Sequence, residues 1–146
     1  MGVVKRGLHK GRGIGGLTTK VHAVVDGLGN PLHFLLSPGT RNDIVYAEEM
    51  LEPFDLSEKK VLADMGYDKD SFCEYIRQRG GDPLIPSRIC KRTQRIIDEH
   101  EYKERHLVEN LFQKLKNYRR FATRYDTLDS SFFAVVLISA ILIWLF

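Results

Sequence analysis

The segment from Tyr102 to Lys116, YKERHLVENLFQKLK, constrains the fold of this 146-residue chain most strongly. On a helix that turns about 100° per residue, most of its apolar side chains share one face. Four polar residues with the spacing Y-x2-R-x3-E-x6-K fall within about 60° of one another on the other face. They are Tyr102, Arg105, Glu109 and Lys116, and Phe112 falls beside them by the same count. The pattern predicts a helix that buries one side and presents a carboxylate flanked by cations on the other.

A second carboxylate follows a short apolar run. Val61, Leu62 and Ala63 are typical of a buried strand, and Asp64 comes directly after them. Acidic residues at the carboxyl end of a strand in an α/β sheet lie at the crevice where ligands bind. Two such carboxylates can hold a divalent cation through hard oxygen ligands. We therefore expect Asp64 and Glu109 to face each other across a cleft and to share a metal ion.

Composition places the chain among ordinary globular proteins. Its length fits one domain, and a hydrophobic content of 43% is sufficient for a core. The net charge is only +3, but basic residues dominate ranges 1–41 and 86–125, whereas range 42–85 is acidic. Basic ends around an acidic middle suit a polyanion beside a metal site, although a solvated charged surface gives the same pattern.

The remaining patterns predict a mixed α/β sheet flanked by helices. Residues 1–16, rich in glycine and basic residues, are expected to form a flexible basic loop that precedes a domain over 17–146. Asp26-Gly27 favours a hairpin turn, and Asp68 is expected to cap the helix that follows it. Predicted strands are Leu17–Gly27, Pro31–Ser37, Lys60–Asp64 and Asp82–Pro86; predicted helices are Asn42–Leu51, Asp70–Arg79, Glu101–Phe121 and Ser130–Phe146, with a basic irregular loop over Ser87–Glu99.

The C-terminal run Phe132–Phe146 is uncharged and raises the question of a membrane anchor. A membrane span needs about 20 apolar residues, and shorter runs are more often core helices. We therefore expect a buried helix and no membrane partner. The N-terminus has no apolar run of the signal-peptide type, and Cys73 and Cys90 lack C-x-x-C spacing, so a cytoplasmic protein with free thiols is expected.

Three blocks of this sequence, in this order, resemble the bacterial insertion-sequence DDE transposases of the insertion sequence four and five groups. The blocks are GGLTTKVHAVVDGLGNPLHFLLSPG from Gly15, LADMGYD from Leu62, and YKERHLVENLFQKLKNYRRFATRYD from Tyr102. The resemblance covers nearly the whole chain. It implies a ribonuclease-H-like fold and DNA as the partner. It also implies that the protein is located in the bacterial cytoplasm, at the nucleoid.

The resemblance also implies roles for individual residues. Asp64 matches the second catalytic acid of the family and Glu109 the third, and both would bind Mg²⁺ or Mn²⁺. Two metal ions about 3.5–4 Å apart would clamp the attacking and leaving oxygens during cleavage and strand transfer. The DNA-binding residues are expected to be Arg105 and Lys116, which would contact phosphate, and Tyr102, Arg119 and Arg120; the Tyr102 ring would stack on a flipped base or pack beneath the DNA.

The first aspartate of the family has no counterpart here. It belongs on the first strand, shortly before the GGLTTK block, but the first acid of this chain is Asp26, in the predicted hairpin turn. We therefore expect a sheet without its first strand and an isolated chain that is catalytically incomplete. The first acid would come from an upstream chain or a frameshifted fusion, and self-association is the other expected contact. The alternative is an inactive DNA-binding or transposase-associating regulatory fragment.

Overall fold

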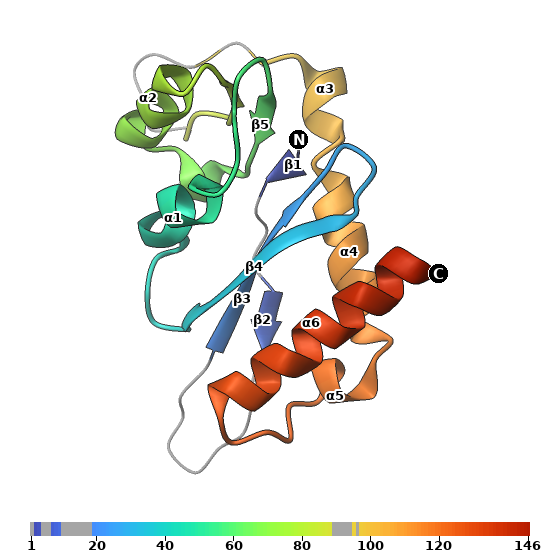
Figure 1. Cartoon of the computed structure of the whole chain (residues 1–146). Coiled ribbons are helices and arrows are strands. Elements are labelled where there is room, and N and C mark those ends of the chain that lie inside the picture. The colour runs from blue at the N-terminus through green and yellow to red at the C-terminus, as the bar shows by residue number, and fades with distance from the viewer. Residues whose placement is uncertain (1, 4–6, 10–18, 89–94, 96) are drawn as a thin grey trace.

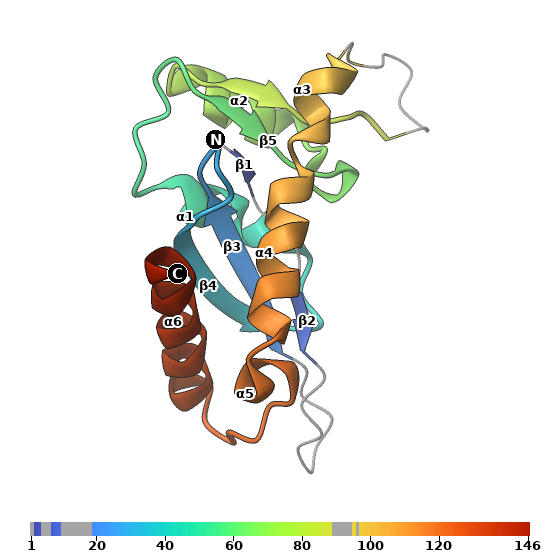
Figure 2. The same cartoon turned by 90° about the vertical axis from the view of Figure 1, so that its right-hand side faces the viewer.

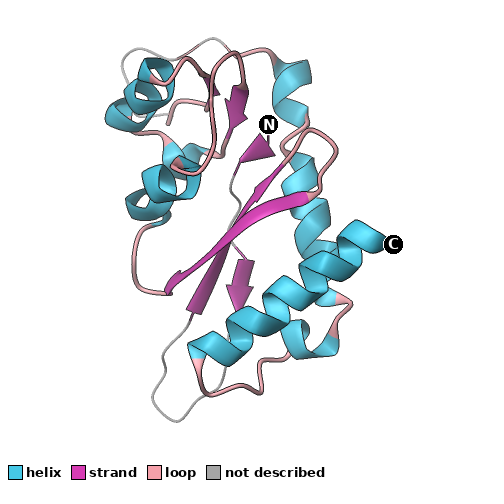
Figure 3. Ribbon diagram, in the orientation of Figure 1, coloured by secondary structure: helices cyan, strands magenta, loops and turns pink. Residues whose placement is uncertain are grey.

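The computed structural model describes residues 2–3, 7–9, 19–88, 95 and 97–146, and the statements below concern these residues (Figure 1). Figure 3 shows how strands run between groups of helices. The strands are β1 (Gly2–Val3), β2 (Gly7–His9), β3 (Thr19–Val25), β4 (Pro31–Pro38), β5 (Lys60–Leu62) and β6 (Asp82–Leu84). The helices are α1 (Ala47–Leu51), α2 (Asp70–Gln78), α3 (Glu99–Lys103), α4 (His106–Lys116), α5 (Arg119–Ala122) and α6 (Asp129–Leu145), with short 3₁₀ turns η1 (Asp43–Tyr46) and η2 (Met65–Tyr67).

One mixed sheet forms the centre of the molecule. β3 pairs antiparallel with β4 and also with β1 and β2. Since a strand has two edges and β4 follows β3 along its length, β1 and β2 occupy the other edge of β3. β1 then pairs parallel with β5, and β5 pairs parallel with β6. The order of strands across the sheet is therefore β4, then β3, then β1 and β2 on the same edge of β3, then β5 beside β1, and finally β6.

The expectation that the first strand is missing is wrong. β1 lies between β3 and β5, with Gly2 opposite both Val25 and Leu62. β2 continues the same edge, with Gly7 opposite Val21. Both strands fall within residues 1–16, where a flexible loop was expected; the remainder of that range lies outside the described residues. The physical reason is that β3 provides an open row of backbone hydrogen-bonding groups, which a glycine-rich segment can satisfy without an apolar pattern of its own.

Helices cover both faces of the sheet, which makes β3 buried along its whole length. Alternate residues of β3 enter different cores because side chains of a strand alternate between its faces. Val24 packs with α1, α2 and β5, whereas Val21, Ala23 and Val25 pack with α4, α5 and α6. Figures 1 and 2 show α4 and α6 on one side of β3 and α1 on the other.

The β3–β4 hairpin confirms the turn predicted at Asp26. The carbonyl of Asp26 accepts from the Gly29 amide, and Gly29 has a φ of +86°. The Asp26 carboxylate also accepts from the Leu28 and Asn30 amides and from the Asn30 side chain. Partial burial raises the pKa of Asp26, but these hydrogen bonds outweigh it and lower the pKa overall. Its carboxylate therefore serves the turn.

The predicted helix Glu101–Phe121 is three helices. Between α3 and α4 the Leu107 and Val108 amides bond the carbonyls three residues earlier, at Glu104 and Arg105, which is a tighter turn than an α-helix. Between α4 and α5 the backbone of Tyr118 is extended, with φ −81° and ψ 112°. α5 therefore leaves the axis of α4, and Arg119 and Arg120 do not continue the polar face of α4.

α6 packs on the sheet along one face, formed by Phe132, Val136, Ser139 and Ala140. The prediction of a buried helix holds for this face only, because Ile138, Ile141 and other apolar side chains opposite are exposed. Near the end of α6 the Trp144 indole Nε1 donates to the Pro31 carbonyl at 2.7 Å, which ties α6 to the start of β4. Within the described residues, no helix combines the length and hydrophobicity that crossing a bilayer requires.

A buried histidine on β3 predicts a pH dependence of stability. His22 is fully buried and hydrogen-bonds Ser37 Oγ at 2.7 Å through Nε2. Burial lowers its pKa below 6.5; Asp43 opposes this shift and Lys20 adds to it. The unfolded chain therefore binds the proton more readily, so the free energy of unfolding should be steady above pH 6.5 and fall as the pH drops below it.

The measurement is urea unfolding over a series of pH values. A His22→Gln variant should lose the part of the slope that lies just below pH 6.5, because no imidazole remains to titrate. An unchanged slope in that variant would assign the pH dependence to other groups.

Candidate active site

Asp64 lies where β5 leaves the buried sheet. Val61 and Ala63 are fully buried, whereas Asp64 is half-buried and lies two residues after the last residue of β5. Its Oδ1 accepts from the Gly66 amide at 2.8 Å and so caps the η2 turn. A Cβ on Gly66 would lie 2.8 Å from that oxygen, so a larger residue there would displace the Asp64 carboxylate from its cap. Among the described residues, none donates to Oδ2 of Asp64, which leaves that oxygen for a ligand.

Glu109 lies in the first turn of α4, next to an arginine. Arg105 Nη1 and Glu109 Oε1 form an ion pair at 3.0 Å, and both side chains are partly buried. The guanidinium carbon of Arg105 also lies 5.5 Å from the centre of the Tyr102 ring, a cation–π distance. The predicted spacing therefore holds for Tyr102, Arg105 and Glu109 in spite of the tight turn between α3 and α4.

The phenol of Tyr102 connects the helix to the strand end. Burial raises its pKa, Arg105 lowers it, and the negative charges of Asp64 and Glu109 raise it further. Both carboxylates are therefore near enough to act on one phenol, although 45 positions separate them in the chain. A tyrosine is protonated at neutral pH in any case, and burial with the two carboxylates moves the Tyr102 hydroxyl still further from ionisation. Asp64 and Glu109 thus both act electrostatically on Tyr102, and Arg105 contacts both Tyr102 and Glu109.

The comparisons with known proteins bear on this arrangement directly. The family model described as "Transposase DDE domain" matches residues 4–145. The chain belongs to the DDE transposase family. It is also similar to the putative transposase for insertion sequence element IS6501 of Brucella ovis, with 36% identity over 133 residues. That alignment covers 88% of this chain and 99% of the relative.

Asp64 and Glu109 are carboxylates, and carboxylate oxygens are ligands that Mg²⁺ prefers in proteins. The fit to a metal cage is partial. No group of three or more histidine, cysteine, aspartate or glutamate side chains gathers within the described residues. Two other acids near the strand ends have different partners: Asp26 holds its turn, and Asp68 is buried under arginines.

Asp68 forms a clamp that sequence reasoning missed. It was expected to cap α2, but Lys69 holds that position and Asp68 points elsewhere. Its carboxylate is fully buried and accepts from the Arg88 amide and from Arg95 Nη2, both at 2.7 Å. Arg95 also donates to the Ile85 carbonyl at 3.0 Å. The clamp therefore pins the segment after β6 to the turn that begins at Asp64.

Breaking the clamp should destabilise the transposase. Arg95→Ala would leave the buried Asp68 carboxylate without its guanidinium, and removal of one partner of a buried ion pair costs about 3 kcal/mol. Arg77→Ala is the matched control, because its pair with Glu74 at 3.9 Å is solvent-exposed and should contribute well under about 1 kcal/mol. Urea unfolding of both variants measures the difference; equal losses would show that the clamp contributes nothing beyond a surface pair.

Three of the predicted DNA-binding residues lie at the far end of α4 and in α5. Lys116 and Arg119 are exposed, and Arg120 is exposed but pairs with Asp126 at 2.8 Å. Arg124, which follows these residues in the chain, is largely buried: it bonds Thr19 and Asp129 and lies 4.8 Å from the Phe132 ring centre. Arg124 therefore holds α6 against β3.

The residue count around the helix was also wrong for Phe112. It falls beside Glu109 and Lys116 on an ideal helix, yet it is buried in the core beside Phe121, with ring centres 6.5 Å apart. The core of α4 includes Val108, Leu111 and Leu115 as predicted. The apolar face of α4 is therefore wider than the ideal helical spacing predicts. Glu109 lies at the margin of this face, which explains why its side chain is partly buried.

Proposed function

We propose that this chain is the catalytic portion of an insertion-sequence transposase that cuts and joins DNA with divalent metal ions. The proposal rests on membership of the DDE transposase family and on the placement of Asp64 after β5 and Glu109 on α4, both near enough to Tyr102 to raise its pKa. The fold would be ribonuclease-H-like. The strand order supports this, because a hairpin-linked antiparallel half adjoins two parallel strands through the N-terminal strand.

Asp64 and Glu109 would hold Mg²⁺ or Mn²⁺ through their carboxylate oxygens. Such ions, when bound in a pair, stabilise the attacking and leaving oxygens of a phosphodiester in line. Arg105 keeps one Glu109 oxygen fixed at 3.0 Å and directs positive charge to where the scissile phosphate becomes more negative. The neutral phenol of Tyr102 offers a flat surface beneath the DNA without repelling phosphate. Lys116, Arg119 and Arg120 would hold the flanking strand by its backbone.

A third carboxylate would have to come from elsewhere. Residues 1–25, which include β1, β2 and β3, contain no acid. β1 is the strand beside β5, so it is the natural neighbour of Asp64, and here it carries none. We propose that an upstream chain, acting in trans or fused by frameshifting, contributes the first aspartate. The protein would act in the bacterial cytoplasm, on the DNA of the nucleoid.

The test is a strand-transfer assay with labelled element ends, run in Mg²⁺, in Mn²⁺ and in a chelator. The chain alone is compared with a fusion that carries the upstream aspartate-bearing segment. We expect metal-dependent joining by the fusion and little by the chain alone. Equal activity of the two proteins would contradict the proposal that an upstream segment supplies the first aspartate. If neither protein joined DNA, the proposed chemistry would be wrong.

A second candidate function is a regulatory one. The lack of a three-acid group among the described residues favours it, because two carboxylates alone hold paired metal ions poorly. An inactive chain would bind element ends or the active transposase and compete with it. DNA binding that persists unchanged in Asp64→Asn and Glu109→Gln, together with inhibition of the active enzyme, would favour this function over catalysis.

A further inference from the structure

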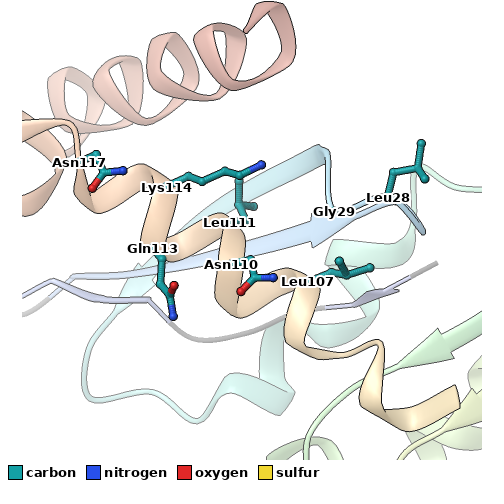
Figure 4. A pocket seen from close by; sticks show the side chains of 8 residues that line it. All are labelled: Leu28, Gly29, Leu107, Asn110, Leu111, Gln113, Lys114 and Asn117. Carbon is teal, nitrogen blue, oxygen red and sulfur yellow. The ribbon is translucent and has the colours of Figure 1, made fainter. Parts of the chain in front are cut away.

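A hollow of about 430 Å³ lies between the tip of the β3–β4 hairpin and α4, and Asp64 is not among the residues that line it. Leu28 and Gly29 of the hairpin line it together with Leu107 of α4. A Cβ on Gly29 would lie 3.4 Å from Leu107, so the hairpin tip is in close packing with α4. Figure 4 shows these residues and the polar side chains that project along α4.

The wall contributed by α4 is rich in amides. Asn110, Gln113 and Asn117 are spaced by three and four residues, so they share one side of the helix. Lys114 lies among them, and all four side chains are exposed. None of the four forms a hydrogen bond or ion pair with another described side chain or backbone group. From Asn110 to Arg120 the chain contains no acid, so the polar part of this wall consists of amides and one lysine, beside Leu107 and Leu111.

The hairpin adds an apolar side chain held in a rigid frame. Leu28 is 82% exposed at the tip of the turn. Its position is fixed by its own amide, which donates to Asp26 Oδ1 at 2.8 Å, and by the Asn30 amide, which donates to the same oxygen. An exposed leucine on a braced turn beside a cationic surface is unfavourable in water and gains free energy if an apolar partner covers it.

We propose that this hollow is a second DNA-contact site, in which the amides read base edges, Lys114 binds a phosphate and Leu28 packs on a base step. The inference rests on the proposed function for its ligand, DNA. Asparagine and glutamine present a donor and an acceptor together, as adenine does in the major groove. The three amides span seven residues, or about 10 Å along the helix axis, which matches about three base pairs. Gln113 of this surface lies one helical turn after Glu109 on α4, so one DNA segment can cover both the surface and Glu109.

The experiment measures binding by fluorescence anisotropy in a chelator, so that no metal chemistry intervenes. The probes are a labelled duplex with the terminal sequence of the element and a random duplex of equal length. The variants of the full chain are Asn110→Ala with Gln113→Ala, Lys114→Gln, and Leu28→Ser. Gln78→Ala is the control, because it is an exposed helical amide on α2. Alanine favours helix, so the amide variants should fold.

We expect each removed amide to weaken binding of the element end about tenfold while binding of the random duplex changes little. Lys114→Gln should weaken both duplexes alike and flatten the salt dependence, since it removes a phosphate contact. Leu28→Ser should weaken binding of the element-end duplex, and Gln78→Ala should leave the affinity for both duplexes unchanged. Unchanged affinities in the amide and Leu28 variants would overturn the inference. The proposed chemistry is judged separately by metal-dependent joining, which a failed contact site would leave intact.

Discussion

Glu109→Gln and Asp64→Asn should each reduce metal-dependent strand joining by the fusion enzyme about 10³-fold. Each change keeps the shape of the side chain but removes the charge that would hold the metal. A loss of about 4 kcal/mol of transition-state stabilisation, ordinary for metal-assisted displacement, corresponds to that factor. The rate is measured as joined product over time at saturating Mg²⁺, with the same DNA substrate throughout.

Glu104→Gln provides the matched control for this prediction. Glu104 precedes α4 by two residues and is exposed, whereas Glu109 is partly buried against Arg105. The control should retain normal joining, and DNA binding in a chelator should remain in all three proteins. Joining that survives in Glu109→Gln would remove this residue from the metal site, and a comparable loss in Glu104→Gln would point to a general effect of negative charge.

Phe132→Ala should destabilise the fold by about 4 kcal/mol, a large share of the stability of a small domain. Phe132 is fully buried, and its ring lies 6.1 Å from that of Phe121 and under the Arg124 guanidinium. Its loss opens a cavity where α5, α6 and β3 meet. Chemical denaturation gives the free energy of unfolding, and circular dichroism checks that the variant remains folded without denaturant.

Phe146→Ala is the counterpart with the same change in chemistry. Phe146 is fully exposed after α6, so its replacement should alter the free energy of unfolding by less than about 0.5 kcal/mol. A small effect of Phe132→Ala, similar to that of Phe146→Ala, would mean that α6 is loosely attached and that the core described here does not hold it.

Features encoded by neighbouring residues were predictable from the sequence. The β3–β4 hairpin follows from alternating apolar strands around Asp26-Gly27, and the buried strand before Asp64 follows from three apolar residues in a row. The opposite faces of α4 follow from helical spacing, with Phe112 as the exception. In each case a local rule of backbone geometry decides the outcome, and tertiary packing agrees with it.

Features that depend on distant partners were missed. β1 and β2 form because β3 offers an edge, and nothing within their own glycine-rich sequence indicates a strand. The buried ion pair of Asp68 and Arg95 joins residues 27 apart, and the attachment of Arg124 to Thr19 joins residues 105 apart. For the candidate site, the strand-end position of Asp64 and the polar helix face around Glu109 suggested the pairing, and resemblance to a family assigned their roles; no spacing rule within the chain fixes the distance between them.

The attachment of Trp144 to Pro31 gives this protein an intrinsic optical reporter. Trp144 is the only tryptophan of the chain, so tryptophan emission arises from one known place. Its indole bonds the first residue of β4 at 2.7 Å. A change of emission wavelength during titration with DNA or denaturant would therefore report when the end of α6 detaches from β4. Comparison with circular dichroism would show whether this happens before the other elements unfold, without any added dye.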